Sequence, residues 1–383
     1  MNKKLKFFII VFVVLTLISS FGTVFALDIK EPSFDLNVKS AVLIEAKTGT
    51  ILYGKNENTP LPPASVTKVM TLLLIFEAIE KGNLKYDEEL TVSEYAASMG
   101  GSQVYLEPGE KMTVDDLLKC VIIASANDAA LTLAEQVAGS EESFVDMMNK
   151  RASELGMKST YFENVTGLDD DVTNHLTSAY DIALMSRELI KHEKVSEYAT
   201  IWMDTIRNGE FGLTNTNRLV RFYKGITGLK TGSTSKAGFC VSVTAKRNGM
   251  ELIAVIMGAE TSEIRNSAAT KLLDYGFANY MVKLEKGNTI ENLPILCGTK
   301  NSFNAKFDDY VLLENKDNRD LTYEIEIDEE ISAPIKEGDK VGRVIYKIGD
   351  KVLDEKPVLS CENVDRITYF QYFVKILKEF IIL

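Results

Sequence analysis

The sequence predicts a mixed α/β chain in which an antiparallel sheet is covered by helices, followed by a small C-terminal all-β domain and a terminal amphipathic helix. Three observations predict this fold class. Strand-like segments near residue 40 and between residues 225 and 259 flank a long helical region, which is typical of a helix-covered sheet whose first and last strands are distant in sequence. Apolar and acidic residues alternate from Leu321 to Asp328, as in half-buried antiparallel strands. The final segment carries one apolar stripe at helical spacing.

The first 26 residues predict a secretory signal peptide. Lys3, Lys4 and Lys6 precede the apolar run Phe7–Leu17, and Val24-Phe25-Ala26 is a small-x-small-like cleavage site. A retained membrane anchor is the alternative. Because the segment holds three lysines and no acidic residue, its removal changes the formal charge from −12 to −15. Such an acidic chain argues against a nucleic-acid partner, since phosphate binding depends on lysine and arginine.

Cysteine and histidine usage limits the possible sites. Four cysteines lie far apart without a Cys-x-x-Cys pair, at Cys120, Cys240, Cys297 and Cys361. The spacing of a metal site is therefore absent, and no cofactor is predicted. Export permits disulfides, although the spacing does not identify any. The two histidines, His175 and His192, leave few candidates for a Ser-His-Asp triad.

A buried helix is predicted directly after Pro62-Pro63. Proline fixes φ and ends the preceding structure, so the helix begins at Ala64 or Ser65; it contains the apolar block Val69–Ile79 and continues to Lys81. Ser65 then lies in the first turn, and Lys68 projects from the same face. A serine beside a lysine at the mouth of a buried helix is the arrangement of an activated nucleophile. The alternative is an ordinary serine N-cap with an exposed lysine.

The other elements of the first domain surround this helix. Strand-like segments are expected at 39–45, 50–55, 225–231, 238–245 and 252–259, and helices at 114–123, 128–138, 140–155, 177–191 and 262–280. Arg247-Asn248-Gly249 predicts a hairpin between the last two strands. Ser125 and Asn127 lie in the short turn between the helices at 114–123 and 128–138. Such a turn holds its side chains firmly beside a cleft.

The character of the sequence changes after the first domain. We expect a signal peptide at 1–26, the first domain at 27–283, a β-rich domain at 284–362 and an amphipathic helix at 363–383.

The last of these segments is too short and too charged to span a membrane, since a membrane span needs roughly 20 mostly apolar residues. It fits a helix lying in a membrane surface, with docking on the β-rich domain as the alternative. The apolar stripe consists of Ile367, Phe370, Phe373, Val374, Leu377, Phe380 and Ile381.

Three short motifs each occur twice. Ser-x-x-Lys occurs at Ser65/Lys68 and Ser233/Lys236, Ser-x-Asn at Ser125/Asn127 and Ser302/Asn304, and Lys-Thr-Gly at Lys47-Thr48-Gly49 and Lys230-Thr231-Gly232. No motif is decisive alone. Only one choice gives a helix start, then an interhelical turn, then a strand, in that order within one domain. That choice is Ser65/Lys68, Ser125/Asn127 and Lys230-Thr231-Gly232, and the first Lys-Thr-Gly is then a hairpin turn.

With these three motifs the chain resembles the serine-type D-alanyl-D-alanine carboxypeptidases of the low-molecular-mass penicillin-binding protein family. The longer segments Ile122–Ala130, Val137–Ser140 and Gly167–Asp169 resemble the carboxypeptidase branch, and the resemblance covers nearly the whole chain. It implies a β-lactamase/transpeptidase-like catalytic domain and a cell-envelope enzyme on the outer face of the cytoplasmic membrane. The enzyme would remove the C-terminal D-alanine from peptidoglycan stem peptides and bind β-lactam antibiotics such as penicillin covalently.

The resemblance assigns a role to each catalytic residue. A serine hydroxyl needs an adjacent base, and with so few histidines Lys68 is the candidate base for Ser65, provided that burial and the charge of Lys230 lower its pKa. Ser125 is expected to relay a proton to the departing amine. Asn127 is expected to hold both Lys68 and the substrate amide. The resemblance also implies that the backbone N–H groups of Ser65 and Ser233 bind the oxyanion. His175 is the rival base, and nothing in the sequence links it to Ser65.

A carboxypeptidase must also recognise a free carboxylate, which calls for fixed positive charge and hydroxyl donors. Lys230, Thr231 and Gly232 lie on the strand expected to flank the cleft, and the resemblance adds Arg265 as a carboxylate ligand. A surface arginine at a helix start is the alternative reading of Arg265. Glu163-Asn164 is similar to the deacylating glutamate of class A β-lactamases, but the surrounding pattern departs from theirs, so no role is assigned.

Two other functions compete with the carboxypeptidase. A serine β-lactamase needs rapid water attack on the acyl-enzyme, and the β-rich domain and terminal helix argue against it. A non-catalytic penicillin-recognising sensor is the second alternative, which a complete set of Ser65, Lys68, Ser125 and Lys230 disfavours. A phosphate-binding loop at residues 225–231 is disfavoured because no glycine directly precedes Lys230.

Overall fold

The structure is a computed structural model that describes residues 29, 32–169, 172–315, 321–349 and 351–381. The expected signal peptide lies outside the described residues. The chain divides into two compact units, one spanning Ile29–Val282 and the other beginning at Lys283. The expected fold class, a helix-covered antiparallel sheet followed by a β-rich unit and a terminal helix, is confirmed.

The first unit is built on a five-stranded antiparallel sheet in the order β2-β1-β9-β8-β7. The strands are β1 (Ser40–Glu45), β2 (Ile51–Lys55), β7 (Ile226–Thr234), β8 (Gly238–Arg247) and β9 (Met250–Ala259). The N-terminal strand β1 pairs with β9, so residues far apart in sequence close the sheet. The predicted hairpin joins β8 to β9, where Asn248 and Gly249 have φ of 50° and 81°, as a type I′ turn requires.

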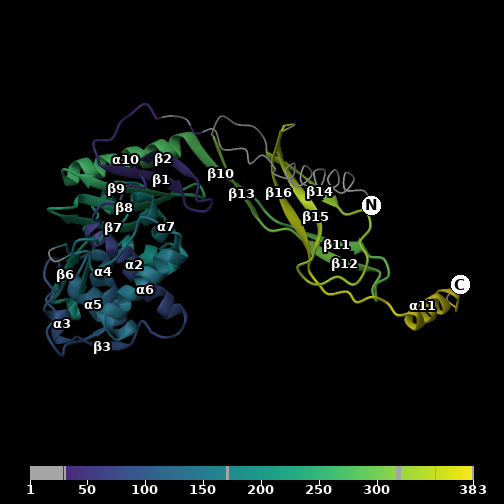
Figure 1. Ribbon diagram of the computed structural model, residues 1–383, viewed down its shortest axis with the longest axis horizontal. Coiled ribbons are helices and arrows are strands. Elements are labelled where there is room, and N and C mark those ends of the chain that lie inside the picture. Colours follow the sequence, from purple (N-terminus) through teal and green to yellow (C-terminus); the bar gives the residue numbers. More distant parts are fainter. Residues whose placement is uncertain (1–28, 30–31, 170–171, 316–320, 350, 382–383) are drawn as a thin grey trace, which may run out of the picture. The chain divides into compact units, whose positions relative to one another are not determined.

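Helices cover both faces of this sheet. On β1 the side chains alternate, so Val42 and Ile44 enter the large core with the helices, whereas Leu43 lies against Gly276 on the other face. Helix α10 (Ser262–Asn279) covers that other face, and α7 (Ala179–Leu189) covers the face with the large core. Figure 1 shows the two helices on opposite sides of the sheet.

The large core is centred on α2 (Lys68–Glu80), which is buried on nearly every side. A short 3₁₀ turn, η1 (Ala64–Thr67), precedes it, so the helix predicted from Ala64 exists with a tightened first turn. Around α2 lie α4 (Val114–Ile123), α5 (Asn127–Ala138) and α6 (Glu141–Glu154). Side chains that accept a backbone N–H bond cap several helices of this unit, such as Thr113 at α4, Ser140 at α6 and Ser178 at α7.

Several short elements of the first unit were not predicted, because three to seven residues carry too little periodicity to identify them. They are α3 (Glu94–Ala97), α8 (Glu193–Ala199), α9 (Leu219–Phe222), η2 (Arg207–Gly209), β3 (Glu89–Thr91), β4 (Lys111–Thr113), β5 (Met203–Ile206) and β6 (Phe211–Thr214). β3 pairs with β4 and β5 with β6, which makes two small hairpin sheets.

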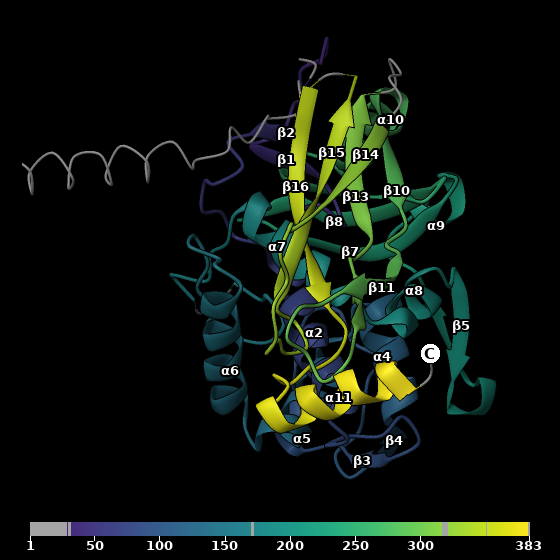
Figure 2. The same ribbon diagram turned by 90° about the vertical axis from the view of Figure 1, so that its right-hand side faces the viewer.

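The second unit contains a five-stranded sheet in the order β11-β12-β16-β15-β14 and the strand pair β10-β13. The strands are β10 (Tyr280–Glu285), β11 (Thr289–Pro294), β12 (Ser302–Lys306), β13 (Tyr310–Asn315), β14 (Leu321–Ile327), β15 (Lys340–Ile348) and β16 (Lys351–Ser360). Figure 2 shows β14, β15 and β16 side by side. Their own small core includes Phe303, Val344 and Tyr346.

The chain continues into the terminal helix α11 (Tyr369–Ile381). Its aromatic residues Tyr369, Phe370 and Phe373 are exposed, at 99%, 77% and 59% of their full accessible surface. In the described ranges, no helix combines the length and the hydropathy of a membrane span.

Candidate active site

The start of the central helix meets the edge strand of the large sheet. Strand β7 passes so close to η1 that a Cβ atom on Gly232 would lie 2.7 Å from the backbone nitrogen of Ser65 and 2.9 Å from that of Val66. Real Cβ atoms essentially never come that close, so only glycine allows this approach. Lys-Thr-Gly and Ser-x-x-Lys, which are far apart in sequence, are therefore brought into contact.

Ser65 and Lys68 form the first pair. The Lys68 Nζ atom lies 3.0 Å from the Ser65 Oγ atom and donates to the carbonyl of Thr166 at 2.9 Å. Lys68 is fully buried. Burial lowers the pKa of Lys68 well below its ordinary value, and the charge of Lys230 lowers it further, while Asp128 acts in the opposite direction. These interactions favour a neutral amine, and a neutral amine has a lone pair that can accept a proton from a neighbouring hydroxyl.

Ser125 and Lys230 form the second pair. Ser125 lies in the predicted turn between α4 and α5, at φ 65°. The Lys230 Nζ atom donates to the Ser125 Oγ atom at 2.8 Å and to the carbonyl of Thr231 at 2.9 Å. Burial, followed by the positive charge of Arg265, lowers the pKa of Lys230 to about 7. The two lysines and two serines thus form two adjacent hydroxyl–amine pairs coupled by charge.

Asn127 is the first residue of α5 and is almost completely buried. Its Nδ2 atom donates to the carbonyl of Gly100 at 2.7 Å. Its Oδ1 atom is buried and has no hydrogen-bond partner among the described residues. The expected bond from Asn127 to Lys68 is not formed in this structure. A buried acceptor without a partner is costly, so Oδ1 is available to a donor from a bound molecule or from Lys68.

The residues expected to bind a carboxylate lie along β7 and the start of α10. The Thr231 hydroxyl donates to that of Thr216 at 2.8 Å. Arg265 is buried, its Nε atom donates to Asn266 at 3.0 Å, and its guanidinium lies 6.0 Å from the Phe239 ring. Ser233 follows Gly232 on the same strand.

A pocket of about 550 Å³ opens beside Thr216. Its lining combines two aromatic rings, two guanidinium groups and polar side chains: Trp202, Thr214, Asn215, Thr216, Arg218, Arg221 and Phe222. Because the Thr216 hydroxyl bonds Thr231, the pocket adjoins the Lys-Thr-Gly strand. The sequence analysis did not identify Thr216 or Arg218, since both belong to a segment without a motif.

His175 has a structural role, which agrees with the absence of any sequence link to Ser65. Its Nδ1 atom accepts the N–H of Glu163 at 3.0 Å, so its Nε2–H group donates to the Thr67 hydroxyl at 2.7 Å. Burial lowers the pKa of His175 to about 4, which leaves the ring neutral at neutral pH. In the described part of the chain no hydrogen bond joins it to Ser65.

The loop from Glu163 to Leu168 orients the Lys68 amine. Asn164 Oδ1 accepts the N–H groups of Thr166 and Gly167 at 3.2 and 2.7 Å, which shapes the turn that presents the Thr166 carbonyl to Lys68. Gly167 has φ of 83°, and a Cβ atom there would lie 1.9 Å from the Ala64 carbonyl oxygen. The Glu163 carboxylate accepts the backbone N–H groups of Thr173 and Asn174 at 3.1 and 2.9 Å, so no role in deacylation is indicated. The sequence did not indicate Thr166, because Thr166 acts through its backbone carbonyl, a group that every residue type carries.

The second copies of the three motifs make other contacts. Lys47–Gly49 forms the turn between β1 and β2, where the Thr48 hydroxyl and N–H bond the Glu45 carboxylate. Lys236 donates to the carbonyl of Asp169, not to Ser233. Ser302 and Asn304 belong to β12 of the second unit. Only the selected copies converge.

Both units of the chain match models of known protein families. Residues 27–261 match the family model described as D-alanyl-D-alanine carboxypeptidase, and residues 282–366 match that of the penicillin-binding protein 5 C-terminal domain. The chain is 43% identical over 342 residues to D-alanyl-D-alanine carboxypeptidase DacF of Bacillus subtilis, covering 87% of each chain. It is 32% identical to DacC of Escherichia coli, covering 89% of this chain and 87% of that one.

Solved structures agree with this assignment. Penicillin-binding protein 5 from Haemophilus influenzae superposes with a TM-score of 0.76 at 29% identity, covering 88% of this chain and all of that one. Penicillin-binding protein D2 from Listeria monocytogenes, solved in an ampicillin-bound form, gives a TM-score of 0.57 at 33% identity, covering 64% of this chain and all of that one.

Proposed function

Because the chain belongs to the D-alanyl-D-alanine carboxypeptidase family, we propose that it removes the C-terminal D-alanine from peptidoglycan pentapeptide stems through an acyl-enzyme on Ser65. The observation that carries the proposal is the contact between the Ser65 hydroxyl and the buried Lys68 amine at 3.0 Å. A neutral amine within hydrogen-bond reach is the base that a serine nucleophile needs.

In the first step Lys68 takes the Ser65 proton while Oγ bonds to the carbonyl carbon of the penultimate D-alanine. The carbonyl oxygen becomes an oxyanion, for which we assign the backbone N–H groups of Ser65 and Ser233 as donors. The close approach at Gly232 supports this assignment, because it brings β7 to the Ser65 nitrogen. In sites of this kind one such donor is worth about 10²–10³-fold in rate.

In the second step the C–N bond breaks and the leaving D-alanine amine takes a proton from Ser125; the proton that Lys68 took from Ser65 then restores the Ser125–Lys230 pair, so that Lys68 is neutral again. The 2.8 Å bond from Lys230 supports this relay, since an amine with a pKa of about 7 donates and accepts protons readily near neutral pH. Water then attacks the ester and gives its proton to Lys68, which returns it to Ser65 as the acyl group leaves. Asn127 Oδ1 accepts the N–H of the substrate amide.

The terminal carboxylate of the substrate binds to Lys230, Thr231 and Arg265, of which the lysine and the arginine supply positive charge. Lys230 and Thr231 lie beside the nucleophile, and Arg265 is close enough to lower the pKa of Lys230. Arg218 lines the adjoining pocket and supplies a further guanidinium. Guanidinium groups bind carboxylates with paired, directional N–H bonds.

A direct test uses the purified protein with a penicillin and, separately, with a peptide that ends in D-Ala-D-Ala. We expect free D-alanine from the peptide and a long-lived penicilloyl adduct in the mass spectrum. Rapid turnover of penicillin would instead indicate a β-lactamase. An adduct without release of D-alanine would indicate a penicillin-recognising sensor, and either result would overturn the proposal.

We further propose an envelope protein with a signal peptide at 1–26, a catalytic domain at 27–283, a β-rich domain at 284–362 and a membrane-surface helix at 363–383. The exposure of Phe370, Phe373 and Ile376 on α11 supports the last assignment, because an amphipathic helix buries such side chains at the bilayer surface.

Deleting the chain from Asp365 onward is expected to move the protein from the membrane fraction to the soluble fraction, because the apolar stripe is lost. Fractionation of cells followed by labelling with a fluorescent penicillin measures the change. A full-length Phe303→Leu variant, altered only in the core of the second unit, is the control and should stay with the membrane. Unchanged fractionation of the truncated chain would contradict the surface-helix assignment.

A further inference from the structure

We infer that Arg207 is a positioning residue for acyl transfer: its guanidinium holds the loop Gly100–Leu106, here called the cleft loop, against α5 and thereby fixes the side-chain amide of Asn127. Arg207 lies in the turn between β5 and β6, outside every motif. The inference rests on the proposed function, because it concerns the efficiency of that reaction.

One side of the cleft loop is bonded to the start of α5. The backbone N–H of Asn127 donates to the Ser102 carbonyl at 2.7 Å, and its Nδ2 atom donates to the Gly100 carbonyl at 2.7 Å. The buried Asp128 carboxylate accepts the N–H of Val104 at 3.1 Å. Both donor groups of Asn127 are thus satisfied by carbonyls of the cleft loop, so the loop determines how the amide is oriented.

Arg207 holds the opposite side of the same loop. Its two terminal nitrogens donate to the carbonyls of Val104 and Tyr105 at 2.9 and 3.0 Å. Its Nε atom and one terminal nitrogen bond both carboxylate oxygens of Glu110, at 2.7 and 2.9 Å. Val104 is therefore held at its N–H by Asp128 and at its carbonyl by Arg207. The cleft loop is clamped between α5 and the β5–β6 turn.

The backbone at this contact is unusual on both sides. Tyr105 has φ of 57°, and Arg207 and Asn208 have φ of 53° and 55°, a region that non-glycine residues rarely occupy. Such conformations persist only where surrounding contacts impose them. The planar guanidinium provides donors in a fixed fork, and all three of its nitrogens are used here; a lysine amine cannot reproduce this geometry.

The consequence for catalysis follows from the unpaired Oδ1 atom of Asn127. Because Nδ2 is tied to Gly100, the amide cannot rotate, and Oδ1 remains the acceptor available to the substrate. If the cleft loop moved away, Nδ2 would lose its acceptor and the amide would be free to turn. Displacing a positioning group by about 1 Å costs up to roughly 100-fold in rate.

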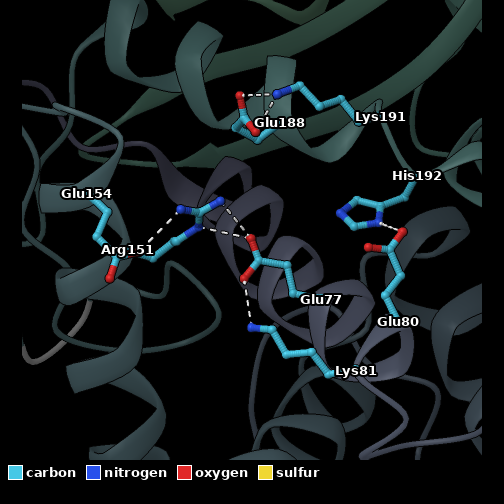
Figure 3. Close-up of polar contacts among 8 residues, drawn as sticks. All are labelled: Glu77, Glu80, Lys81, Arg151, Glu154, Glu188, Lys191 and His192. Atoms are coloured by element: carbon cyan, nitrogen blue, oxygen red, sulfur yellow. Dashed lines mark hydrogen bonds and ion pairs between the residues drawn. The ribbon is translucent and has the colours of Figure 1, made fainter. Parts of the chain in front are cut away.

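The test compares Arg207→Ala with Arg207→Lys and with Arg151→Ala as the matched control. Arg151 also binds a carboxylate through two nitrogens, which both bond one oxygen of Glu77 at 2.9 and 2.8 Å, but it joins α6 to α2 and touches no residue assigned to the site (Figure 3). We expect kcat/KM for D-alanine release from a D-Ala-D-Ala peptide to fall roughly 10- to 100-fold in Arg207→Ala, less in Arg207→Lys, and not in Arg151→Ala. Thermal unfolding of all three variants shows the loss of stability separately.

A double-mutant cycle distinguishes positioning from a general loss of stability. If Arg207 acts through the Asn127 amide, Arg207→Ala should lower kcat/KM in the wild-type background but have little further effect in an Asn127→Ala background. Equal fold losses in both backgrounds, or a lower Tm with unchanged kcat/KM, would overturn the inference while leaving the proposed function intact. Wild-type protein that releases no D-alanine would overturn the proposed function itself.

Discussion

The Ser65→Ala protein is expected to release no D-alanine above background and to gain no mass from penicillin. Among the described residues, the Ser65 hydroxyl is the one that is hydrogen-bonded to the buried Lys68 amine, and losing the nucleophile of a comparable serine hydrolase costs on the order of 10⁶-fold in kcat. Ser65 is only partly buried in η1 and no helix cap depends on its side chain. The Tm of the variant should therefore remain close to that of the wild type.

Mass spectrometry of the intact protein and an assay of free D-alanine measure this outcome. Ser302→Ala is the matched control, because Ser302 begins the chance copy of Ser-x-Asn in β12. That variant should form the penicilloyl adduct and release D-alanine at the wild-type rate. A Ser65→Ala protein that still forms an adduct, or still releases D-alanine, would show that another residue is the nucleophile.

Replacing Lys68 by methionine is expected to slow acylation of Ser65 by about 10²–10⁴-fold, the contribution typical of a general base. Methionine has nearly the same length as lysine and suits the buried position, but it has no lone pair to accept the Ser65 proton. Arginine at this position should be equally inactive, since its guanidinium does not lose its charge. The rate of adduct formation with penicillin, followed by mass spectrometry, gives the comparison.

The pH dependence of acylation tests whether Lys68 is the base. Because burial and Lys230 lower the pKa of Lys68, its neutral form is the active one, and acylation by the wild type should fall as pH drops through that lowered pKa. Lys68→Met should lose this acidic limb of the profile. The exposed Lys191, which binds Glu188 at the end of α7 (Figure 3), supplies the control variant Lys191→Met, with a wild-type rate and profile. An unchanged acidic limb in Lys68→Met would assign the titration to another group.

Local patterns predicted the long elements well and the short ones poorly. The helix after Pro62-Pro63, the turn with Ser125 and the strand with Lys230 all exist as expected, because each depends on a proline, a turn or a run of apolar residues near in sequence. The hairpin β5–β6 and the turn that carries Arg207 were missed. Their stability comes from contacts such as that of Arg207 with Glu110, nearly one hundred positions earlier in the chain, which no local pattern records.

By itself, the sequence determined which residue types are available and in what order: a serine and a lysine at a helix start, a serine and an asparagine in a turn, and a lysine on a strand. The order of the elements also selected one copy of each motif, but only the tertiary structure brings the selected copies together. It does so by bringing β7 against η1 at Gly232 and by burying Lys68 next to Lys230 and the Thr166 carbonyl. The physical reason is that the pKa of an amine depends on the solvent and charge removed or placed around it in three dimensions.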